Sequence, residues 1–278
     1  MQNLVSAEWL YQNLSNENIF ILDASQKDNK AGLKPKFENL QIKNAHFFDL
    51  KKFSDAKSSL PSMLPSESYF EENCRKLGIN KNSQIIVYDN LGVHTSPRVW
   101  WMFKAMGHEN VAVLDGGLDA WVNNGYETEA INIEITTENE QESQLEGDFK
   151  ANFQPQYVRN IEGIKTNIET KKEYVLDARS VGRFNGTEEE PRKGLKSGSI
   201  PNSFNLPFEN VLQDRKYKSK EELKVIFERL NLQDKPVVFS CGSGITACII
   251  LLAAELVFPN QQKSIYDGSW TEWAQTML

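Results

Sequence analysis

Cys241 is the residue whose type and surroundings point most directly to chemistry. It follows a short apolar run, Val237 to Ser240, and begins a turn with Gly242 and Gly244 that leads into an apolar helical pattern from Ala247. Glycine permits backbone angles that other residues avoid, so the N–H groups of this turn can point inward and hold an anion. The start of the following helix adds partial positive charge. These groups favour a thiolate, which makes Cys241 a candidate nucleophile.

Other chemistries for this loop lack a required residue. A phosphatase-type loop carries an arginine six positions after its cysteine, and this chain has Ala247 there. A cysteine protease needs a histidine base, and none of the three histidines lies in a recognisable protease context. Cys74 and Cys248 are expected to be core residues, and the wide cysteine spacing indicates neither a disulfide framework nor paired CxxC metal ligands.

The chain repeats its own pattern, which indicates two domains of one kind. Three pairs of segments recur in the same order: ILDAS from Ile21 and VLDARS from Val175, IIVYDN from Ile85 and VVFSCG from Val237, and LDGGLDAW from Leu114 and YDGSWTEW from Tyr266. Asp89 then corresponds to Cys241 and Asp115 to Asp267, with the same offset in residue number. This shared register supports a duplication.

Each half alternates short apolar, β-prone runs with helical patterns, which is typical of an α/β fold with a mainly parallel sheet flanked by helices. The halves are joined by a polar, acidic stretch with little apolar periodicity. We predict a non-catalytic domain over residues 1–135, an acidic linker over 136–152 and a catalytic domain over 153–278. Cys241 should lie where the carboxyl end of a strand meets a helix, a common place for active groups in such sheets.

The composition narrows the class of protein. A length of 278 residues fits two domains, and a net charge of -7 disfavours nucleic acid as a partner. The start of the chain lacks a basic segment followed by an apolar one, so we expect no secretion signal. The longest apolar stretch, 247–258, contains Glu255 and is shorter than the roughly 20 residues that span a bilayer. We therefore expect a cytoplasmic protein with reduced thiols and no membrane partner.

The segment CGSGIT from Cys241 resembles the catalytic loop of the 3-mercaptopyruvate sulfurtransferases, which are tandem-domain relatives of rhodanese. Segments beginning at Ser96, Ala178 and Ser199 resemble that family too, so the resemblance covers nearly the whole chain. It implies two rhodanese-like domains, of which the second is catalytic. It also implies that sulfur passes from 3-mercaptopyruvate, or less readily thiosulfate, through a persulfide on Cys241 to a thiol, thioredoxin or cyanide. No metal or organic cofactor is implied.

The resemblance assigns roles around the thiol. Ser243 is expected to be catalytic, and Arg183 and Arg192 are expected to recognise the substrate carboxylate, which a guanidinium can bind with two hydrogen bonds. The remaining substrate-binding residues are expected in the loop itself: Gly242, Gly244, Ile245 and Thr246. Relatives that prefer thiosulfate carry basic residues just after the cysteine, and the neutral residues here favour mercaptopyruvate.

The proton path departs from the family pattern of serine, histidine and aspartate. By register, Ser62 and Lys51 stand at the histidine and aspartate positions. His94 stands where relatives place an aromatic residue facing the catalytic cleft, so we predict that it transfers a proton, the alternative being a packing residue. A different class of function is also open: a non-catalytic sulfur carrier or binding module that receives sulfur on Cys241 from a partner protein.

Overall fold

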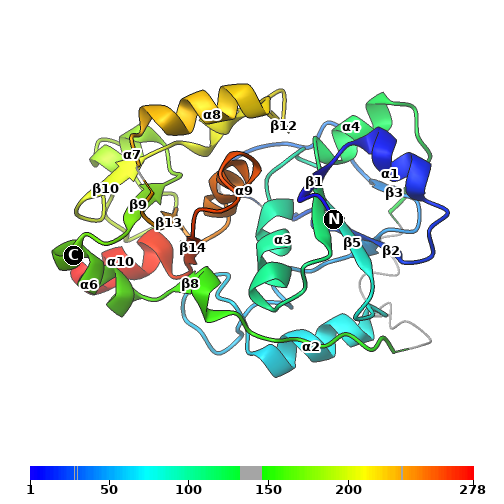
Figure 1. Cartoon of the computed structure of the whole chain (residues 1–278), viewed down its shortest axis with the longest axis horizontal. Coiled ribbons are helices and arrows are strands. Elements are labelled where there is room, and N and C mark those ends of the chain that lie inside the picture. Colours follow the sequence, from blue (N-terminus) through cyan, green and yellow to red (C-terminus); the bar gives the residue numbers. More distant parts are fainter. Residues whose placement is uncertain (28, 30, 132–145, 233) are drawn as a thin grey trace. The chain divides into compact units, whose positions relative to one another are not determined.

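The computed structural model describes residues 1–27, 29, 31–131, 146–232 and 234–278, which form two compact units (Figure 1). The first unit comprises residues 1–56 and 64–153, and the second comprises residues 57–63 and 154–278. Of the linker predicted over 136–152, residues 136–145 lie outside the described residues, and 146–152 belong to the first unit.

The first unit is built on a parallel sheet. Its strands are β1 (Leu4–Val5), β2 (Ile19–Asp23), β4 (His46–Phe47), β5 (Gln84–Tyr88) and β6 (Val111–Leu114). They lie in the order β1-β6-β5-β2-β4, and each neighbouring pair is parallel. A small antiparallel pair, β3 (Leu40–Ile42) and β7 (Thr128–Ala130), lies apart from this sheet. The β5 strand is buried at its centre, as its run of apolar residues predicts.

Helices cover both faces of this sheet. They are α1 (Ala7–Asn13), α2 (Glu67–Lys76), α3 (Ser96–Ala105) and α4 (Gly117–Asn123). Leu10 of α1 and Trp121 of α4 pack against Ile86 and Leu114 in one buried cluster. A second cluster joins the rings of α2, α3 and nearby segments: Phe48, Phe53, Phe70, Phe103 and Phe149.

The second unit repeats this design. Its strands are β8 (Val158–Arg159), β9 (Tyr174–Asp177), β10 (Ser203–Asn205), β13 (Val237–Ser240) and β14 (Lys263–Tyr266). Their order is β10-β9-β13-β14-β8, with parallel neighbours throughout. When the strand order of one sheet is reversed, β5 corresponds to β13 and β6 corresponds to β14, as the repeated segments predict. A short antiparallel pair, β11 (Leu212–Gln213) and β12 (Lys216–Tyr217), is added outside the sheet.

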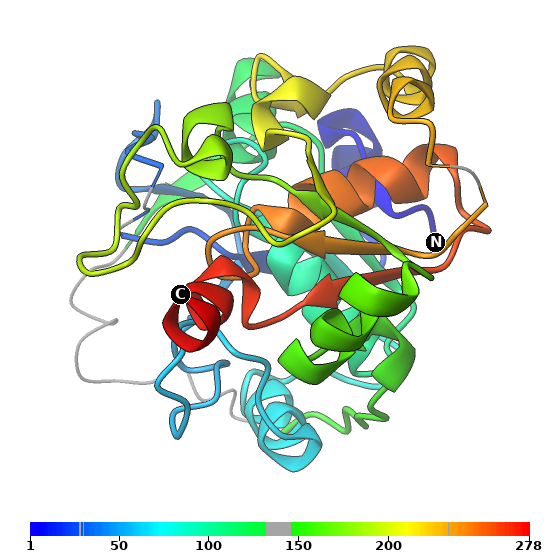
Figure 2. The same ribbon diagram turned by 90° about the vertical axis from the view of Figure 1, so that its left-hand side faces the viewer.

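The helices of the second unit again lie on both faces of the sheet, as Figure 2 shows. They are α6 (Ile161–Thr170), α7 (Val181–Asn185), α8 (Lys220–Arg229), α9 (Ala247–Val257) and α10 (Ser269–Met277), with 3-10 turns η1 (Pro155–Tyr157) and η2 (Phe208–Val211). Ile164 of α6 and Trp270 and Trp273 of α10 pack on Val238 and Tyr266. On the other face α8 packs against α9.

The predicted α/β class, with a mainly parallel sheet in each half, is confirmed. The apolar stretch after Cys241 forms α9, whose residues 247–254 are all buried. Among the described residues, no helix is long and apolar enough to cross a membrane.

Candidate active site

Cys241 lies at the carboxyl end of β13, in the middle of the second sheet, and its loop leads into α9. The residue is only 2% exposed. Three positions later Gly244 has a φ of 76°, in the left-handed region that glycine adopts without strain. Cys74 and Cys248 are buried free cysteines, as predicted. Burial raises the pKa of Cys74 well above its usual value, so Cys74 stays a thiol.

The matching loop of the first unit shows what this backbone can hold. Asp89 follows β5 as Cys241 follows β13, and Gly92 has a φ of 91° at the position of Gly244. One oxygen of the Asp89 carboxylate accepts the N–H groups of His94, Thr95 and Ser96 at 2.8–2.9 Å and the Ser96 hydroxyl at 2.7 Å. The loop thus forms an anion cradle of backbone donors, filled by its own side chain.

The same register identifies the corresponding donors in the second unit. The other Asp89 oxygen accepts the Leu91 N–H at 3.0 Å, and Leu91 corresponds to Ser243. His94 and Thr95 correspond to Thr246 and Ala247. By this correspondence, the N–H groups of Ser243 and Thr246 are the counterparts of two donors that hold the Asp89 carboxylate.

Two guanidinium groups lie beside the cysteine loop. Arg192 donates a hydrogen bond from Nη2 to the Ser243 hydroxyl at 3.0 Å. Burial lowers the pKa of Arg192, while the charge of Cys241 raises it and that of Arg183 lowers it further. A Cβ atom added to Gly242 would lie 3.0 Å from Nη2 of Arg183 and 3.5 Å from Nη1 of Arg192. A glycine at 242 therefore lets both cations approach the loop closely, and they can bind a carboxylate there.

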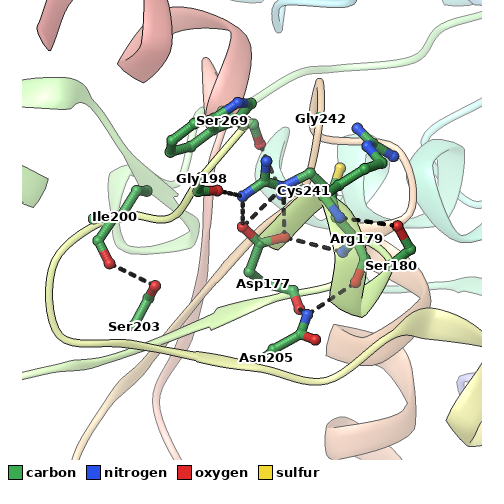
Figure 3. A network of polar contacts seen from close by, with 12 residues as sticks. Asp177, Arg179, Ser180, Gly198, Ile200, Ser203, Asn205, Cys241, Gly242 and Ser269 are labelled. Atoms are coloured by element: carbon green, nitrogen blue, oxygen red, sulfur yellow. Dashed lines mark hydrogen bonds and ion pairs between the residues drawn. The ribbon is translucent and has the colours of Figure 1, made fainter. Parts of the chain in front are cut away.

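A buried ion-pair network holds Arg183 in place. Glu190 accepts hydrogen bonds from Arg183 Nη2 at 2.6 Å and from Arg179 Nη1 at 2.8 Å, and its side chain is 1% exposed. Arg179 also donates to both oxygens of Asp177 and to the Gly198 carbonyl oxygen at 2.7 Å (Figure 3). Its guanidinium stacks on the Trp270 ring at 4.2 Å.

The pKa of Arg179 is raised. Burial lowers it, but the hydrogen bonds and charges of Asp177 and Glu190 together outweigh that effect. Both carboxylates and the cation are fully buried. Removing any one of them would leave an unpaired buried charge, which strongly lowers stability.

Alternate residues of one short segment reach three parts of the site. Glu188 accepts a hydrogen bond from the Ser180 hydroxyl at 2.7 Å, at the start of α7, which carries Arg183. Glu190 holds Arg183, and Arg192 contacts Ser243. Glu189, which lies between Glu188 and Glu190, is exposed. The sequence showed three consecutive glutamates and gave no sign that the outer two anchor the site.

His94, the predicted proton carrier, and Ser62 and Lys51, at the family's histidine and aspartate positions, lie in different parts of the chain. His94 is 5% exposed within the first unit, and burial lowers its pKa while the Asp89 charge raises it. Its Nδ1 lies 3.4 Å from the Thr95 hydroxyl. Ser62 lies in residues 57–63, which group with the second unit, and has a φ of 60°; Lys51 is exposed in the first unit. The role predicted for His94 stays a prediction.

Across the described residues, histidine, cysteine, aspartate and glutamate side chains do not gather in any group of three or more that could hold a metal ion. The functional groups that sequence reasoning missed are Arg179, Glu190, Ser269 and Thr271. The last two belong to the repeated segment YDGSWTEW and form hydrogen bonds with the cysteine loop.

Comparisons with known proteins agree with this geometry. The profile of the rhodanese-like domain matches residues 6–124 and 160–276. The chain is 38% identical to the human 3-mercaptopyruvate sulfurtransferase, covering 97% of this chain and 91% of that protein. It is 40% identical to the mitochondrial thiosulfate/3-mercaptopyruvate sulfurtransferase 1 of Arabidopsis thaliana, covering 98% and 76%. The crystal structure of SseA from Escherichia coli, a 3-mercaptopyruvate sulfotransferase, matches with a TM-score of 0.81 and 32% identity, covering 97% and 99%. The expectation of two rhodanese-like domains is confirmed.

Proposed function

Because this chain belongs to the rhodanese-like family and is a sulfurtransferase, we propose that it takes sulfur from 3-mercaptopyruvate onto Cys241 and passes it to an acceptor. The observation that carries the proposal is the correspondence between two loops. The N–H groups of Leu91 and His94 hold the Asp89 carboxylate in the first unit, and by register their counterparts are Ser243 and Thr246 in the loop of the Cys241 thiol. A loop of this kind stabilises a sulfur anion, and arginines beside it suit a carboxylate.

The first half of the reaction is a transfer between sulfur atoms. The Cys241 thiolate attacks the thiol sulfur of mercaptopyruvate, and the bond between that sulfur and carbon breaks. The electron pair of the broken bond goes to the carbon and forms the enolate of pyruvate. The proton of the substrate thiol ends on that carbon, so the products are pyruvate and the persulfide anion of Cys241. No oxidant or reductant is consumed.

Substrate recognition is proposed for Arg183 and Arg192. Their guanidinium groups flank Gly242, and a carboxylate bridging them would place the substrate thiol near Cys241. The loop residues Gly242, Gly244, Ile245 and Thr246 supply backbone contacts rather than side-chain charge. Thiosulfate carries two negative charges and lacks the carboxylate geometry, so we propose mercaptopyruvate as the preferred donor and thiosulfate as a poorer one.

Ser243 and His94 are proposed to carry the proton. The Ser243 hydroxyl accepts a hydrogen bond from Arg192, which leaves its own proton to be donated elsewhere. Burial lowers the pKa of His94, so at pH 7 it is a neutral imidazole that can take the proton of the substrate thiol and return it to the enolate.

The second half of the reaction releases the sulfur. A thiol attacks the outer sulfur of the persulfide, which restores the Cys241 thiolate and leaves a persulfide on the acceptor. Small thiols, a protein dithiol such as thioredoxin, and cyanide all have the required nucleophile. We further propose a cytoplasmic location, since all three cysteines are free thiols.

One experiment tests the function. Purified protein is incubated with mercaptopyruvate or thiosulfate and a dithiol acceptor, and pyruvate and sulfite release are measured alongside intact mass. We expect steady pyruvate release, a mass gain of one sulfur that reductant removes, and neither in Cys241→Ser. A persulfide that maps to Cys74 or Cys248 would refute the assignment. A single loading without turnover would favour a sulfur carrier, and faster sulfite release would make thiosulfate the donor.

A further inference from the structure

The first residues of α10 contact the peptide groups on both sides of Gly242. The Ser269 hydroxyl accepts the Cys241 N–H at 3.2 Å, and the Trp270 N–H donates to the Cys241 carbonyl oxygen at 2.9 Å. The N–H and hydroxyl of Thr271 both donate to the Gly242 carbonyl oxygen, at 3.1 Å and 2.6 Å. Figure 3 shows Ser269, Cys241 and Gly242 close together at the Arg179 network.

These contacts fix the direction of the N–H groups in the loop. In a trans peptide the carbonyl and the following N–H point in opposite directions, and the described peptides are all trans. Binding the Cys241 carbonyl to Trp270 therefore turns the Gly242 N–H away from α10. Binding the Gly242 carbonyl to Thr271 likewise turns the Ser243 N–H away.

The first unit shows which acceptor such an N–H group binds. Leu91 corresponds to Ser243, and its N–H donates to the Asp89 carboxylate, the group that stands in place of the thiol. The Asp89 carbonyl is bound by the Leu118 N–H, as the Cys241 carbonyl is bound by Trp270. The backbone arrangement is thus shared, and the N–H of Ser243 is aimed at the group on residue 241.

The two hydroxyls, in contrast, occur in the catalytic unit at positions where the first unit has Gly117 and Asp119. Gly117 has a φ of 50° and Ser269 a φ of 51°, so both residues have the same left-handed φ. A Cβ on Gly117 would lie 2.2 Å from the Asp89 carbonyl oxygen, so the first unit has no room for a side chain there. A left-handed conformation disfavours serine, which is nevertheless kept in the second unit.

Two hydrogen bonds of the Ser269 side chain give a physical reason for a serine at this position. It accepts from the Cys241 N–H and donates to the Tyr266 carbonyl oxygen at 2.8 Å. The bond ties the start of the cysteine loop to the end of the neighbouring strand β14. Donors that are already oriented stabilise a developing charge without having to rearrange.

We propose that the hydroxyl groups of Ser269 and Thr271 are positioning groups of the cysteine loop, which hold the peptides around Gly242 so that the loop N–H groups face the Cys241 sulfur. They stabilise the Cys241 thiolate itself. They also stabilise the persulfide anion, a part of the inference that rests on the persulfide route proposed above. Neither hydroxyl needs to touch the substrate.

The test compares hydroxyl removal with matched controls. Ser269→Gly restores the residue of the first unit, relieves the left-handed serine and removes the hydroxyl. Thr271→Val removes a hydroxyl without changing shape, Thr271→Ser keeps it, and Thr276→Val removes an exposed hydroxyl on the same helix. Two quantities are measured: the alkylation rate of Cys241 by iodoacetamide at pH 7, read from its peptide by mass spectrometry, and turnover of mercaptopyruvate.

We expect alkylation and kcat to fall about tenfold in Ser269→Gly and Thr271→Val, with KM nearly unchanged, because the loop N–H groups that stabilise the thiolate lose their fixed orientation. Thr271→Ser and Thr276→Val should match the parent within about twofold. Ser269→Gly should melt no lower than the parent, which separates positioning from a role in stability. Parent-like alkylation in folded Ser269→Gly would overturn the proposal. Alkylation needs no sulfur donor, so this result is independent of whether mercaptopyruvate is the substrate.

Discussion

Asp89 occupies in its loop the position that Cys241 occupies in the other, and its carboxylate accepts hydrogen bonds from the N–H groups of Leu91, His94, Thr95 and Ser96. Asp89→Asn should lower the free energy of unfolding by about 3 kcal/mol, because the new NH₂ group faces N–H donors that lose their acceptor. Urea unfolding measures this. A loss below about 1 kcal/mol would mean that the cradle tolerates a neutral group.

Glu190→Gln should weaken substrate capture. The amide has one oxygen for two arginines, so Arg183 loses its fixed position beside Gly242. We expect KM for mercaptopyruvate to rise about tenfold and kcat to change less than about threefold, as for lost binding of both ground and transition state. Glu189→Gln, on the exposed neighbour, is the control. A selective loss of kcat in Glu190→Gln would contradict a role in holding Arg183.

Gly242→Ala should also weaken substrate capture, by displacing the arginines from the loop. The new methyl group would lie 3.0 Å from Arg183 Nη2 and would have to push this guanidinium or that of Arg192 away. KM for mercaptopyruvate should rise about fivefold to tenfold, which corresponds to about 1 kcal/mol of lost binding. Gly163→Ala, where the methyl makes ordinary contacts at 3.5 Å or more, should leave KM unchanged. Equal KM values in both variants would show that the arginines accommodate the methyl.

His94→Phe tests the proton route. If neutral His94 takes the substrate proton, turnover falls as the pH falls through its pKa, which burial places below the ordinary value of 6.5. The variant should lose about a hundredfold in kcat and should lack this acid limb. The pH profile of kcat is the measurement. An unchanged profile and rate would make His94 a packing residue.

Stability should fall on mild acidification. Burial lowers the pKa values of His46, His94 and His108, so the unfolded chain binds more protons than the folded one below pH 6.5. The stability that neutral histidines contribute is therefore present above pH 6.5 and is lost as the pH falls through their folded values. His108 lies 3.0 Å from the Ser83 carbonyl, and His108→Gln keeps a donor without the titration. Urea unfolding at pH 7 and 5.5 should show a loss that is smaller in the variant, by up to about 1.4 kcal/mol per pH unit.

The sequence carried the features that depend on local pattern or on repetition. Short apolar runs predicted the strands, the repeated register paired Asp89 with Cys241, and glycines around the thiol predicted the turn. The two site arginines came from the family resemblance. Their closeness to the loop at Gly242 supports that assignment.

Contacts between distant segments could not be predicted. Glu190 and Arg183 are near neighbours in sequence, but the burial that makes their pairing strong depends on Trp270 and Gly198 packing around Arg179. Ser269 is 28 residues from Cys241 along the chain, and its left-handed backbone is visible only in the fold. The grouping of residues 57–63 with the second unit likewise has no signal in the local pattern.

The filled cradle of the first unit bears on how duplicated domains specialise. Placing a thiol at position 89 would not reproduce the surroundings of Cys241, because Ser25 stands where the second unit has Arg179, and Gly117 leaves no room for a hydroxyl-bearing side chain. Asp23, the counterpart of Asp177, is buried without that arginine beside it, and burial raises its pKa. The two units therefore share the backbone of this loop but differ in several side chains around it. A chemical difference between the two copies is thus spread over separate positions, and a single substitution would not transfer it from one to the other.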